Sequence, residues 1–179
     1  NYDRLLIATG STPFIPPIPG SDLPGVLGYR DIADTEAMIN AAEHYKHAVV
    51  IGAGLLGLEA ANGLMLRGMD VTIIHLGDWI MERQLDKTAA DMLQSSLEAR
   101  GMKFLLSKNT EALQASPNGR VSSVRLKDGI EIPADLVVVA AGIRPNYALA
   151  ESAGLYCGSG RVRGIHVSDT LQTVTDPSV

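Results

Sequence analysis

Apolar residues follow two different spacings along the chain. Short apolar runs predict buried strands. They occupy residues 48–51 and 71–74, which are rich in β-branched residues, and residues 103–106. Around these runs apolar residues recur every three or four positions, which predicts amphipathic helices; these occupy residues 31–44, 55–67 and 85–100. Strands that alternate with helices of this length predict a parallel sheet with helices on its faces.

The helix ends carry their own signals. Asp31 or Asp34 can cap the first helix, since an acidic side chain accepts from the free amides of the first turn. Gly68 follows the second helix in the way a C′ glycine does, and Gly101 ends the third.

The pattern changes after residue 106. Short strands separated by tight turns are expected at residues 111–115, 120–126 and 130–133, and they predict an antiparallel meander in place of the next crossover helix. A continuous apolar run at residues 135–140 is typical of a buried parallel strand. The fold class expected is therefore α/β: a Rossmann-like parallel sheet with helices on its faces and an antiparallel β-meander crossover.

The two ends of the chain give weaker signals. Residues 5–10 predict a buried strand that ends at Gly10, although a strand needs neighbours to pair with. Residues 11–20 are rich in proline, which removes amide donors and favours extended backbone, so they predict a semi-rigid connector. A surface loop within one domain is the alternative. Residues 148–154 predict one or two helical turns.

The organising motif is G-x-G-x-x-G, formed by Gly52, Gly54 and Gly57 between a predicted strand and a predicted helix. This is the context that a dinucleotide-binding turn requires. Gly52 allows the tight turn, Gly54 lets the backbone approach a pyrophosphate, and Gly57 lets the helix pack closely on the sheet. The free amides and the positive dipole end of the helix would then face the phosphates.

Composition narrows the classes of function. The 179 residues are 46% hydrophobic, and a net charge of −5 argues against a nucleic-acid-binding surface. No apolar run is long enough to cross a membrane, so we expect no transmembrane helix. The single cysteine, Cys157, excludes an internal disulfide and fits a reducing cytoplasm. His44 and His47 lie three apart without partner ligands, so no metal site is expected.

Three separated motifs resemble one family. Residues 2–11 (YDRLLIATGS) resemble a strand of the FAD-dependent pyridine nucleotide-disulfide oxidoreductases, where it closes part of the FAD domain. Residues 52–59 (GAGLLGLE) resemble the NAD(P)H-side glycine fingerprint of that family, and residues 140–146 (AAGIRPN) resemble its ATGxRPN segment. Within the family, residues 75–86 and 169–173 are similar to the large subunit of assimilatory NAD(P)H nitrite reductases.

The resemblance implies a domain organisation. We expect residues 1–28 to be the end of an FAD-domain strand plus the proline-rich connector, residues 29–150 to be the NAD(P)H-binding domain, and residues 151–179 to return towards the FAD domain. The family's first FAD fingerprint and its final GD motif are missing, so the chain resembles an excised NAD(P)H domain. FAD, sirohaem and an iron–sulfur cluster are implied for the full-length protein only.

The implied reaction is hydride transfer from nicotinamide C4 to flavin N5, used by the full-length protein to reduce nitrite to ammonia. It requires no catalytic side chain and no metal ligand in this chain. The cofactor-binding residues implied by the resemblance are Thr9, Gly10, Gly52, Ala53, Gly54, Leu55, Leu56, Gly57, Glu59, His75, Arg83, Ala141 and Gly142.

Several of these residues have distinct implied roles. Thr9 and Gly10 would lie near the flavin. Gly142 would lie near the nicotinamide ribose, and Glu59 beside the nicotinamide itself. For Glu59, a glutamate that the helix dipole favours is the alternative.

His75 stands at the end of the second strand, where an Asp or Glu usually accepts from the ribose hydroxyls. Neutral His75 could accept from one hydroxyl, whereas protonated His75 together with Arg83 would favour a 2′-phosphate. Both NADH and NADPH therefore stay open, with a lean towards NADH from the third glycine.

Other functions also stay open. A rubredoxin or ferredoxin reductase or an NADH oxidase would share most of these motifs, and a non-catalytic NAD(P)H-sensing module would bind coenzyme without reducing a flavin. The partners expected are NAD(P)H and the FAD domain of the same polypeptide, in the cytoplasm, and a homodimer is left open. Trp79 could pack over the adenine or anchor a loop, and Cys157 is interpreted as a bystander.

Overall fold

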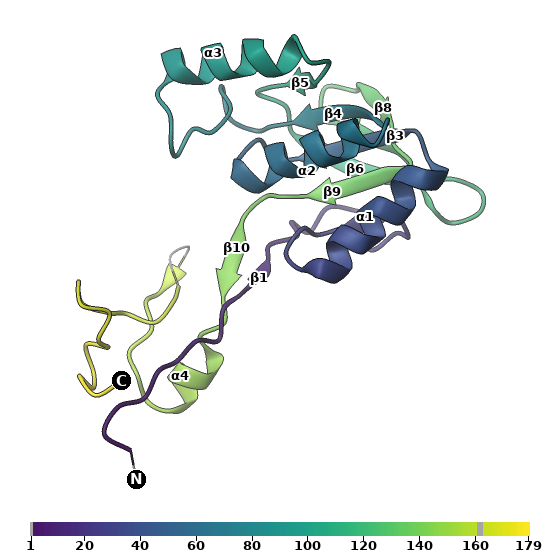
Figure 1. Cartoon of the computed structure of the whole chain (residues 1–179). Coiled ribbons are helices and arrows are strands. Elements are labelled where there is room, and N and C mark those ends of the chain that lie inside the picture. The colour runs from purple at the N-terminus through teal and green to yellow at the C-terminus, as the bar shows by residue number, and fades with distance from the viewer. Residues whose placement is uncertain (1, 161–162) are drawn as a thin grey trace. The chain divides into compact units, whose positions relative to one another are not determined.

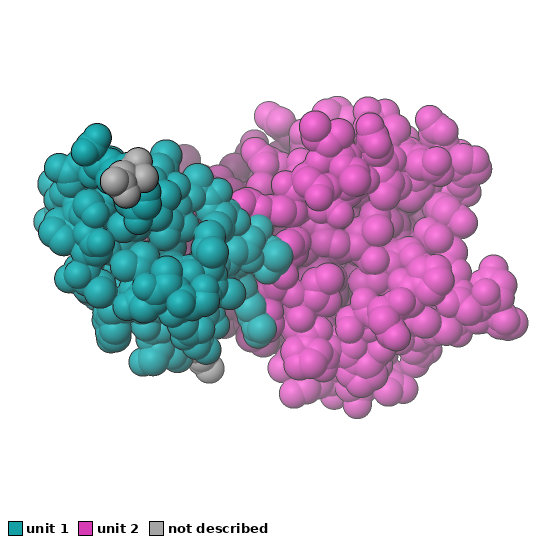
Figure 2. All heavy atoms as spheres, turned by 90° about the horizontal axis from the view of Figure 1, so that it is seen from below, with its two compact units in different colours: residues 1–12, 143–179 teal, residues 13–142 magenta. Residues whose placement is uncertain are grey.

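The computed structural model describes residues 2–160 and 163–179, and the chain divides into two compact units (Figure 2). Unit 2 comprises residues 13–142, and unit 1 comprises residues 1–12 and 143–179. This division differs from the three segments expected, because the proline-rich stretch bonds to unit 2. The amide of Leu113, for example, donates to the Pro19 carbonyl oxygen at 2.8 Å. The expected domain boundaries stay a prediction; residues 1, 161 and 162, which they include, lie outside the described residues.

A five-stranded parallel sheet forms the centre of unit 2, in the order β2-β9-β3-β4-β5. Helix α2 (Leu55–Leu66) connects β3 to β4, and helix α3 (Lys87–Glu98) connects β4 to β5. The expected Rossmann-like sheet is confirmed. Its strands are β2 (Val26–Leu27), β3 (His47–Ile51), β4 (Asp70–Ile74), β5 (Lys103–Leu105) and β9 (Leu136–Val139).

Acidic side chains cap two of the helices. Helix α1 (Ile32–His44) begins after Asp31, whose Oδ1 accepts from the Asp34 amide at 3.0 Å. Asp34 Oδ2 accepts in turn from the Asp31 amide at 3.2 Å, which completes a capping box. Asp86 caps α3 by accepting from the Ala89 amide at 2.9 Å. Both aspartates named from the sequence therefore take part in starting α1.

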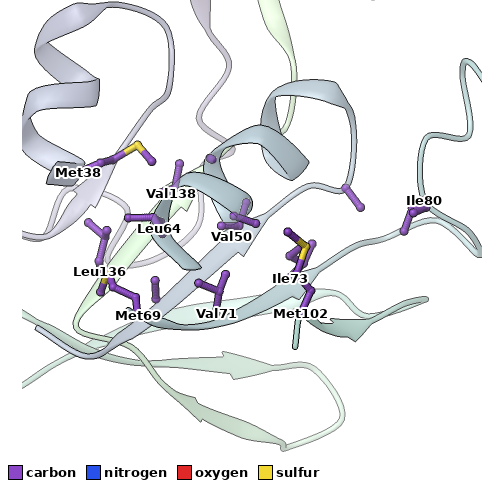
Figure 3. Close-up of a cluster of buried hydrophobic side chains, with 14 of the residues drawn as sticks. Met38, Val50, Leu64, Met69, Val71, Ile73, Ile80, Met102, Leu136 and Val138 are labelled. Atoms are coloured by element: carbon purple, nitrogen blue, oxygen red, sulfur yellow. The ribbon is translucent and has the colours of Figure 1, made fainter. Parts of the chain in front are cut away.

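Alternate residues of the central strands belong to two different core clusters. Val50 of β3 packs in the cluster that contains Met38 of α1 and Leu64 of α2, together with Val138 of β9 (Figure 3). Its neighbour Val49 packs in the other cluster, with the meander. Because both faces of the strands are covered, the strands are continuous apolar runs.

The second face of the sheet carries the expected antiparallel meander. It consists of β6 (Thr110–Ala115), β7 (Val121–Leu126) and β8 (Glu131–Pro133), and it connects β5 to β9 (Figure 1). Leu113, Val124 and Leu126 bury their side chains against the sheet. Unit 2 is therefore built from three layers, with helices on one face and the meander on the other.

Residues 5–10 do not form the buried strand that the sequence predicted. They carry no strand assignment, and the side chain of Leu6 is 88% exposed. The Leu5 amide donates to the Ser178 carbonyl oxygen at 3.0 Å, but no ladder of bonds follows within the described residues. Instead, β1 (Ser11–Pro13) pairs with β10 (Ile143–Pro145). The prediction was wrong because apolar content alone does not supply a partner strand.

Unit 1 has little regular structure. Besides β10, it contains α4 (Ala148–Ser152) and the isolated bridges Cys157–Ile165 and Val167–Thr173. Leu6, Leu149 and other large apolar side chains of this unit are mostly exposed. In the part of the chain that the structure describes, no helix has the length and apolar character needed to cross a bilayer.

Candidate nucleotide-binding site

A pocket of about 530 Å³ lies at the carboxyl ends of β3, β4 and β9. Ligands of open parallel sheets bind at this edge. The lining comes from the glycine turn, the end of β4 and the loop after it, the β5–β6 connection and the end of β9, with a contribution from the proline-rich stretch. All of these segments belong to unit 2.

The three glycines of the turn have different surroundings. Gly52 has a φ of +114°, and a Cβ there would overlap the Ala140 carbonyl oxygen. A Cβ on Gly57 would overlap the Gly52 carbonyl oxygen, so α2 could not start so close to the strand. At Gly54, no atom lies within 4 Å of the Cβ position. The turn is therefore packed against protein at two glycines and open at the third, as close approach of a ligand requires.

Helix α2 begins at this opening. Its N-cap, Gly54, provides no side-chain hydrogen bond, and its first turn contains no acidic residue. The first amides of a helix have no acceptor within the helix, so those of Leu55 and Leu56 are not satisfied by a cap. Together with the positive end of the helix dipole, they form an anion-binding site of the kind that accepts a phosphate.

Two buried polar atoms that line the pocket have no hydrogen-bond partner among the described residues. They are His75 Nε2 and Thr110 Oγ1. The other ring nitrogen of His75, Nδ1, accepts from the Ala53 amide at 3.3 Å. A buried polar group without a partner costs on the order of 1–3 kcal/mol. Two such atoms, both on residues that line one pocket, point to a polar ligand as their partner.

The loop after β4 is tied to the glycine turn. Met81 donates its amide to the Ala53 carbonyl oxygen at 2.9 Å and has a positive φ of 56°, and Ile80 beside it is fully buried. Trp79 packs on the helical core, and its Nε1 donates to the Leu85 carbonyl oxygen at 3.3 Å. Of the two roles that the sequence left open for Trp79, the structure therefore favours anchoring the loop.

The predicted site residues are only partly brought together. Gly57 is buried beneath the turn, whereas Leu55, Leu56 and Glu59 are exposed on α2 outside the lining. Glu59 is the fifth residue of α2, beyond the first turn where the dipole acts most strongly. Those that line the pocket are Gly52, Ala53, Gly54, His75, Arg83, Ala141 and Gly142.

Thr9 and Gly10 belong to unit 1, where both contact Asn146. Thr9 Oγ1 donates to the Asn146 carbonyl oxygen, and Asn146 Nδ2 donates back to the Thr9 carbonyl oxygen at 2.9 Å. The Asn146 amide donates to the Gly10 carbonyl oxygen at 2.9 Å. Two motifs quoted from the sequence, residues 2–11 and 140–146, are thus joined through one asparagine. Their relation to a flavin stays a prediction.

Sequence reasoning missed several lining residues, among them Glu82, Lys108 and Thr110. Lys108 and Thr110 follow β5, whose carboxyl end lies at the same edge of the sheet, so the strand order was the signal that could have found them. Lys108 Nζ is bonded to Asp128, and this bond lowers the pKa of the Asp128 carboxyl below its usual value. Lys108 is therefore already neutralised within the protein.

The described side chains do not form a metal centre at this site. Among the described residues, no group of three or more His, Cys, Asp or Glu side chains is arranged to hold a metal ion. Cys157 is a free thiol of unit 1, half-buried near the Leu155 carbonyl oxygen. One cysteine cannot provide the thiolates that an iron–sulfur cluster needs. The residues present therefore fit a dinucleotide and do not fit the cluster or sirohaem.

Comparison with known proteins agrees with this site. The nitrite reductase [NAD(P)H] of Bacillus subtilis (strain 168) is 55% identical over 172 residues, which are 96% of this chain and 21% of that protein. The structure of an NAD-dependent persulfide reductase from A. fulgidus is 38% identical with a TM-score of 0.89, covering 99% of this chain and 32% of that chain. A water-forming NADH oxidase from Lactobacillus brevis, bound to NADH, is 27% identical with a TM-score of 0.85, covering 99% of this chain and 38% of that chain.

The chain thus spans between 21% and 38% of the length of these proteins. The α/β fold class and the similarity to nitrite reductases, both expected from the sequence, are confirmed. The model of the pyridine nucleotide-disulphide oxidoreductases matches residues 1–179, and the chain belongs to that family.

Proposed function

We propose that this chain is the NAD(P)H-binding portion of a flavin-dependent reductase. The observation that carries the proposal is the glycine turn. Gly52 and Gly57 are packed against backbone oxygens, while Gly54 alone faces open space at the start of α2. Such a turn has the shape and the free amides that a pyrophosphate needs.

The rest of the pocket supports the same ligand. Gly142 has a φ of +121° and no atom within 4 Å of its Cβ position, which leaves room for a ribose at the end of β9. His75 Nε2 and Thr110 Oγ1 are buried without a partner among the described residues, and both residues line the pocket. The roles of Glu59 beside the nicotinamide, and of Thr9 and Gly10 near a flavin, rest on family resemblance and belong to this proposal.

NAD(P)H supplies the hydride, and FAD accepts it. The chain contributes binding and orientation through the glycine turn and the polar atoms of the pocket. Ile51, Ile74 and Phe14 contribute apolar surface to the lining, which excludes water from the bound coenzyme. A general acid or a nucleophile is not required for this role.

The FAD domain of the same polypeptide is the proposed partner. Unit 1 has an apolar groove of about 430 Å³, lined by Leu5, Leu6, Leu149 and neighbouring residues. Large apolar side chains left this exposed mark a surface that another part of a protein covers. The relatives' greater length supports a covering domain outside this chain. A homodimer is a second way to cover the groove.

For the whole protein, we propose reduction of nitrite to ammonia in the cytoplasm. The 55% identity to a nitrite reductase supports this activity. Sirohaem and the iron–sulfur cluster would be held elsewhere in the polypeptide, since this chain has one cysteine. The test is NADH consumption by the purified full-length protein. Consumption that requires nitrite supports the proposal, and consumption with oxygen or ferredoxin alone favours an oxidase or a ferredoxin reductase.

The coenzyme role is tested on the 179-residue chain itself by calorimetric titration with NADH, NADPH and FAD. We expect saturable binding of a nicotinamide coenzyme and no tight binding of FAD. Circular dichroism on the same sample verifies that the chain is folded. A folded chain that binds neither NADH nor NADPH contradicts the proposed function.

A further inference from the structure

His75, one residue after β4 ends, occupies the position where an Asp or Glu that binds the ribose hydroxyls is expected. Its backbone is fixed on both sides, because its amide donates to the Leu105 carbonyl oxygen at 2.9 Å and its carbonyl oxygen accepts from the Lys108 amide at 3.0 Å. The imidazole is 14% exposed and lies at the edge of the pocket. His75 is therefore well placed to contact a ligand, but its chemistry differs from that of an acid.

Hydrogen bonding within the protein defines which ring nitrogen of His75 is free. Nδ1 accepts from the Ala53 amide, so it carries no proton, and the neutral ring carries its proton on Nε2. A protonated ring would place a second N–H against the Ala53 amide. Nε2 is therefore a buried donor without a partner in the described protein, on a residue that lines the pocket. This geometry favours neither of the two roles suggested for His75 from the sequence, since both required an acceptor or a cation.

An acceptor is supplied by Glu82, from the loop that follows. Its Oε2 lies 3.9 Å from His75 Nε2, too far for a direct hydrogen bond. The loop brings this carboxylate back to the end of β4 through Met81, which has a positive φ and is bonded to Ala53. A donor and an anionic acceptor are thus presented side by side at the pocket.

Gly77 provides the space for the Glu82 carboxylate. A Cβ on Gly77 would overlap Glu82 Oε2 and lie 2.9 Å from His75 Nε2. Its φ is not in the left-handed region, so backbone conformation does not require glycine here. The contact with Glu82 and His75 is therefore the reason that the structure offers for glycine at this position.

We propose that Glu82, with His75 as its donor partner, selects NADH over NADPH by binding the 2′-hydroxyl of the adenosine ribose. A hydroxyl oxygen can accept from His75 Nε2 while its proton is donated to Glu82. Each contact would be about 2.8 Å. Nε2 is covered in the unliganded chain, so the Glu82 side chain, which is 46% exposed, shifts to admit the hydroxyl between the two groups. A 2′-phosphate has no comparable proton to donate, and its charge is repelled by the carboxylate. This inference rests on the proposed binding of a nicotinamide coenzyme.

The cations of the pocket do not reverse this preference. Lys108 is bonded to Asp128, so its charge is balanced within the protein. Arg83 is exposed and adjoins Glu82 in sequence, so it brings one positive charge next to one negative charge. A 2′-phosphate would lie near both Glu82 and Arg83, whose opposite charges cancel, so this pair gives it no net attraction.

The test is calorimetric titration of the 179-residue chain with NADH and with NADPH, for the wild type and for Glu82→Gln. The amide keeps the volume of the carboxylate and an oxygen that accepts, but it removes the charge. We expect NADH affinity within about threefold of the wild type and a rise of about tenfold in NADPH affinity. Glu43→Gln removes a charge from an exposed position on α1 outside the pocket, and it should leave both affinities unchanged.

Gly77→Ala tests the same arrangement without altering charge. The methyl group displaces the flexible end of Glu82, so the preference for NADH should fall by about threefold while the unfolding midpoint stays near that of the wild type. In the double variant with Glu82→Gln, the alanine should have no further effect on the preference, because the carboxylate that it displaces is gone.

The outcomes separate the inference from the proposed function. A folded wild-type chain that binds neither coenzyme overturns both. A wild-type chain that binds coenzyme, with the same NADH-to-NADPH preference in Glu82→Gln, overturns the inference alone and leaves the proposed function standing.

Discussion

Polar groups at the two ends of the parallel sheet in unit 2 differ in whether they find hydrogen-bond partners within the protein. At the amino end, Lys103 Nζ donates to both carboxylate oxygens of Asp70, at 2.6 and 2.8 Å, and this joins β5 to β4. Asp135, just before β9, accepts from the backbone amides of Lys46 and His47 at 3.2 and 2.9 Å, and this joins β9 to β3. These carboxylates hold strands together.

At the carboxyl end, polar groups are left for something else. His75 Nε2 and Thr110 Oγ1 are buried without partners in the described residues, and α2 starts without a side-chain cap. The same strands run between the two ends, so strand type and core packing do not explain the contrast. Polar groups that serve the fold are satisfied by the fold, whereas those of a binding site are completed by a ligand.

One atom at the amino end departs from this rule. Arg120 Nε is also buried without a partner. Its guanidinium nevertheless donates through Nη2 to the Asp135 carbonyl oxygen at 3.1 Å and lies 4.1 Å from the centre of the Tyr45 ring. The charged group as a whole is held, whereas the hydroxyl of Thr110 has no second polar atom through which it could be held.

Gly52→Ala should have the largest effect, because it disrupts the glycine turn at the carboxyl end of the sheet. Alanine would need a φ near +114°, and its Cβ would overlap the Ala140 carbonyl oxygen. We expect the free energy of unfolding to fall by about 2–4 kcal/mol, measured by urea denaturation. NADH binding should weaken by more than about tenfold in calorimetry.

Gly63→Ala is the matched control, since Gly63 lies inside α2 with no atom within 4 Å of its Cβ position. Alanine favours the helix there, so stability should rise by about 0.5–1 kcal/mol and NADH affinity should not change. A Gly52→Ala chain as stable as the wild type would contradict the packing argument.

Gly54→Ala should separate binding from stability. Gly54 has a φ of −85°, which alanine adopts, and its Cβ would contact no protein atom. We expect the free energy of unfolding to stay within about 0.5 kcal/mol of the wild type. The methyl group would occupy the space at the start of α2, so NADH affinity should fall by about tenfold. Unchanged affinity in this variant would show that the pyrophosphate does not approach the turn.

The sequence was sufficient for the features that depend on local rules. The glycine turn, the capping aspartates of α1 and the apolar runs of the parallel strands each follow from neighbours in sequence, and the structure has them. Residues 5–10 failed because a strand depends on a partner that sequence spacing does not reveal. The short edge strand β2 was not predicted for the same reason, since it is defined by its pairing with β9.

The residues of the pocket also divide into those that local sequence predicts and those that depend on distant parts of the chain. Its backbone half, at Gly52–Gly54 and Gly142, was predicted from motifs. Glu82 and Thr110 were missed, because each reaches the pocket through the path of a loop that no motif encodes. The role of His75 was left open because its free nitrogen is decided by the amide of Ala53, a contact across 22 residues of sequence.

Thr110→Val should have a smaller effect, and it should change coenzyme affinity without lowering stability. Valine has nearly the shape of threonine and removes the buried hydroxyl that lacks a partner. Stability should be unchanged or higher by up to about 1 kcal/mol, because no protein hydrogen bond is lost. If the hydroxyl binds the coenzyme, NADH affinity falls about three- to tenfold. Equal affinity in calorimetry would remove Thr110 from the site and leave its hydroxyl without an explanation.

Asp70→Asn should have the smallest effect, and on stability alone. The hydrogen bond from Lys103 lowers the pKa of the Asp70 carboxyl below its usual value of 3.8. A carboxyl with a lowered folded pKa contributes stability above its unfolded pKa, and the contribution is lost as pH falls through the folded pKa. The side chains of Lys103 and Asp70 are 58% and 40% exposed, so at pH 7 we expect a loss of only about 0.5 kcal/mol. Urea denaturation should show this difference at pH 7 and show it begin to shrink below pH 3.8 and vanish once the pH is below the lowered folded pKa, with NADH affinity unchanged throughout. A loss of NADH binding in this variant would mean that the amino end of the sheet also serves the ligand, and the contrast between the two ends would not hold.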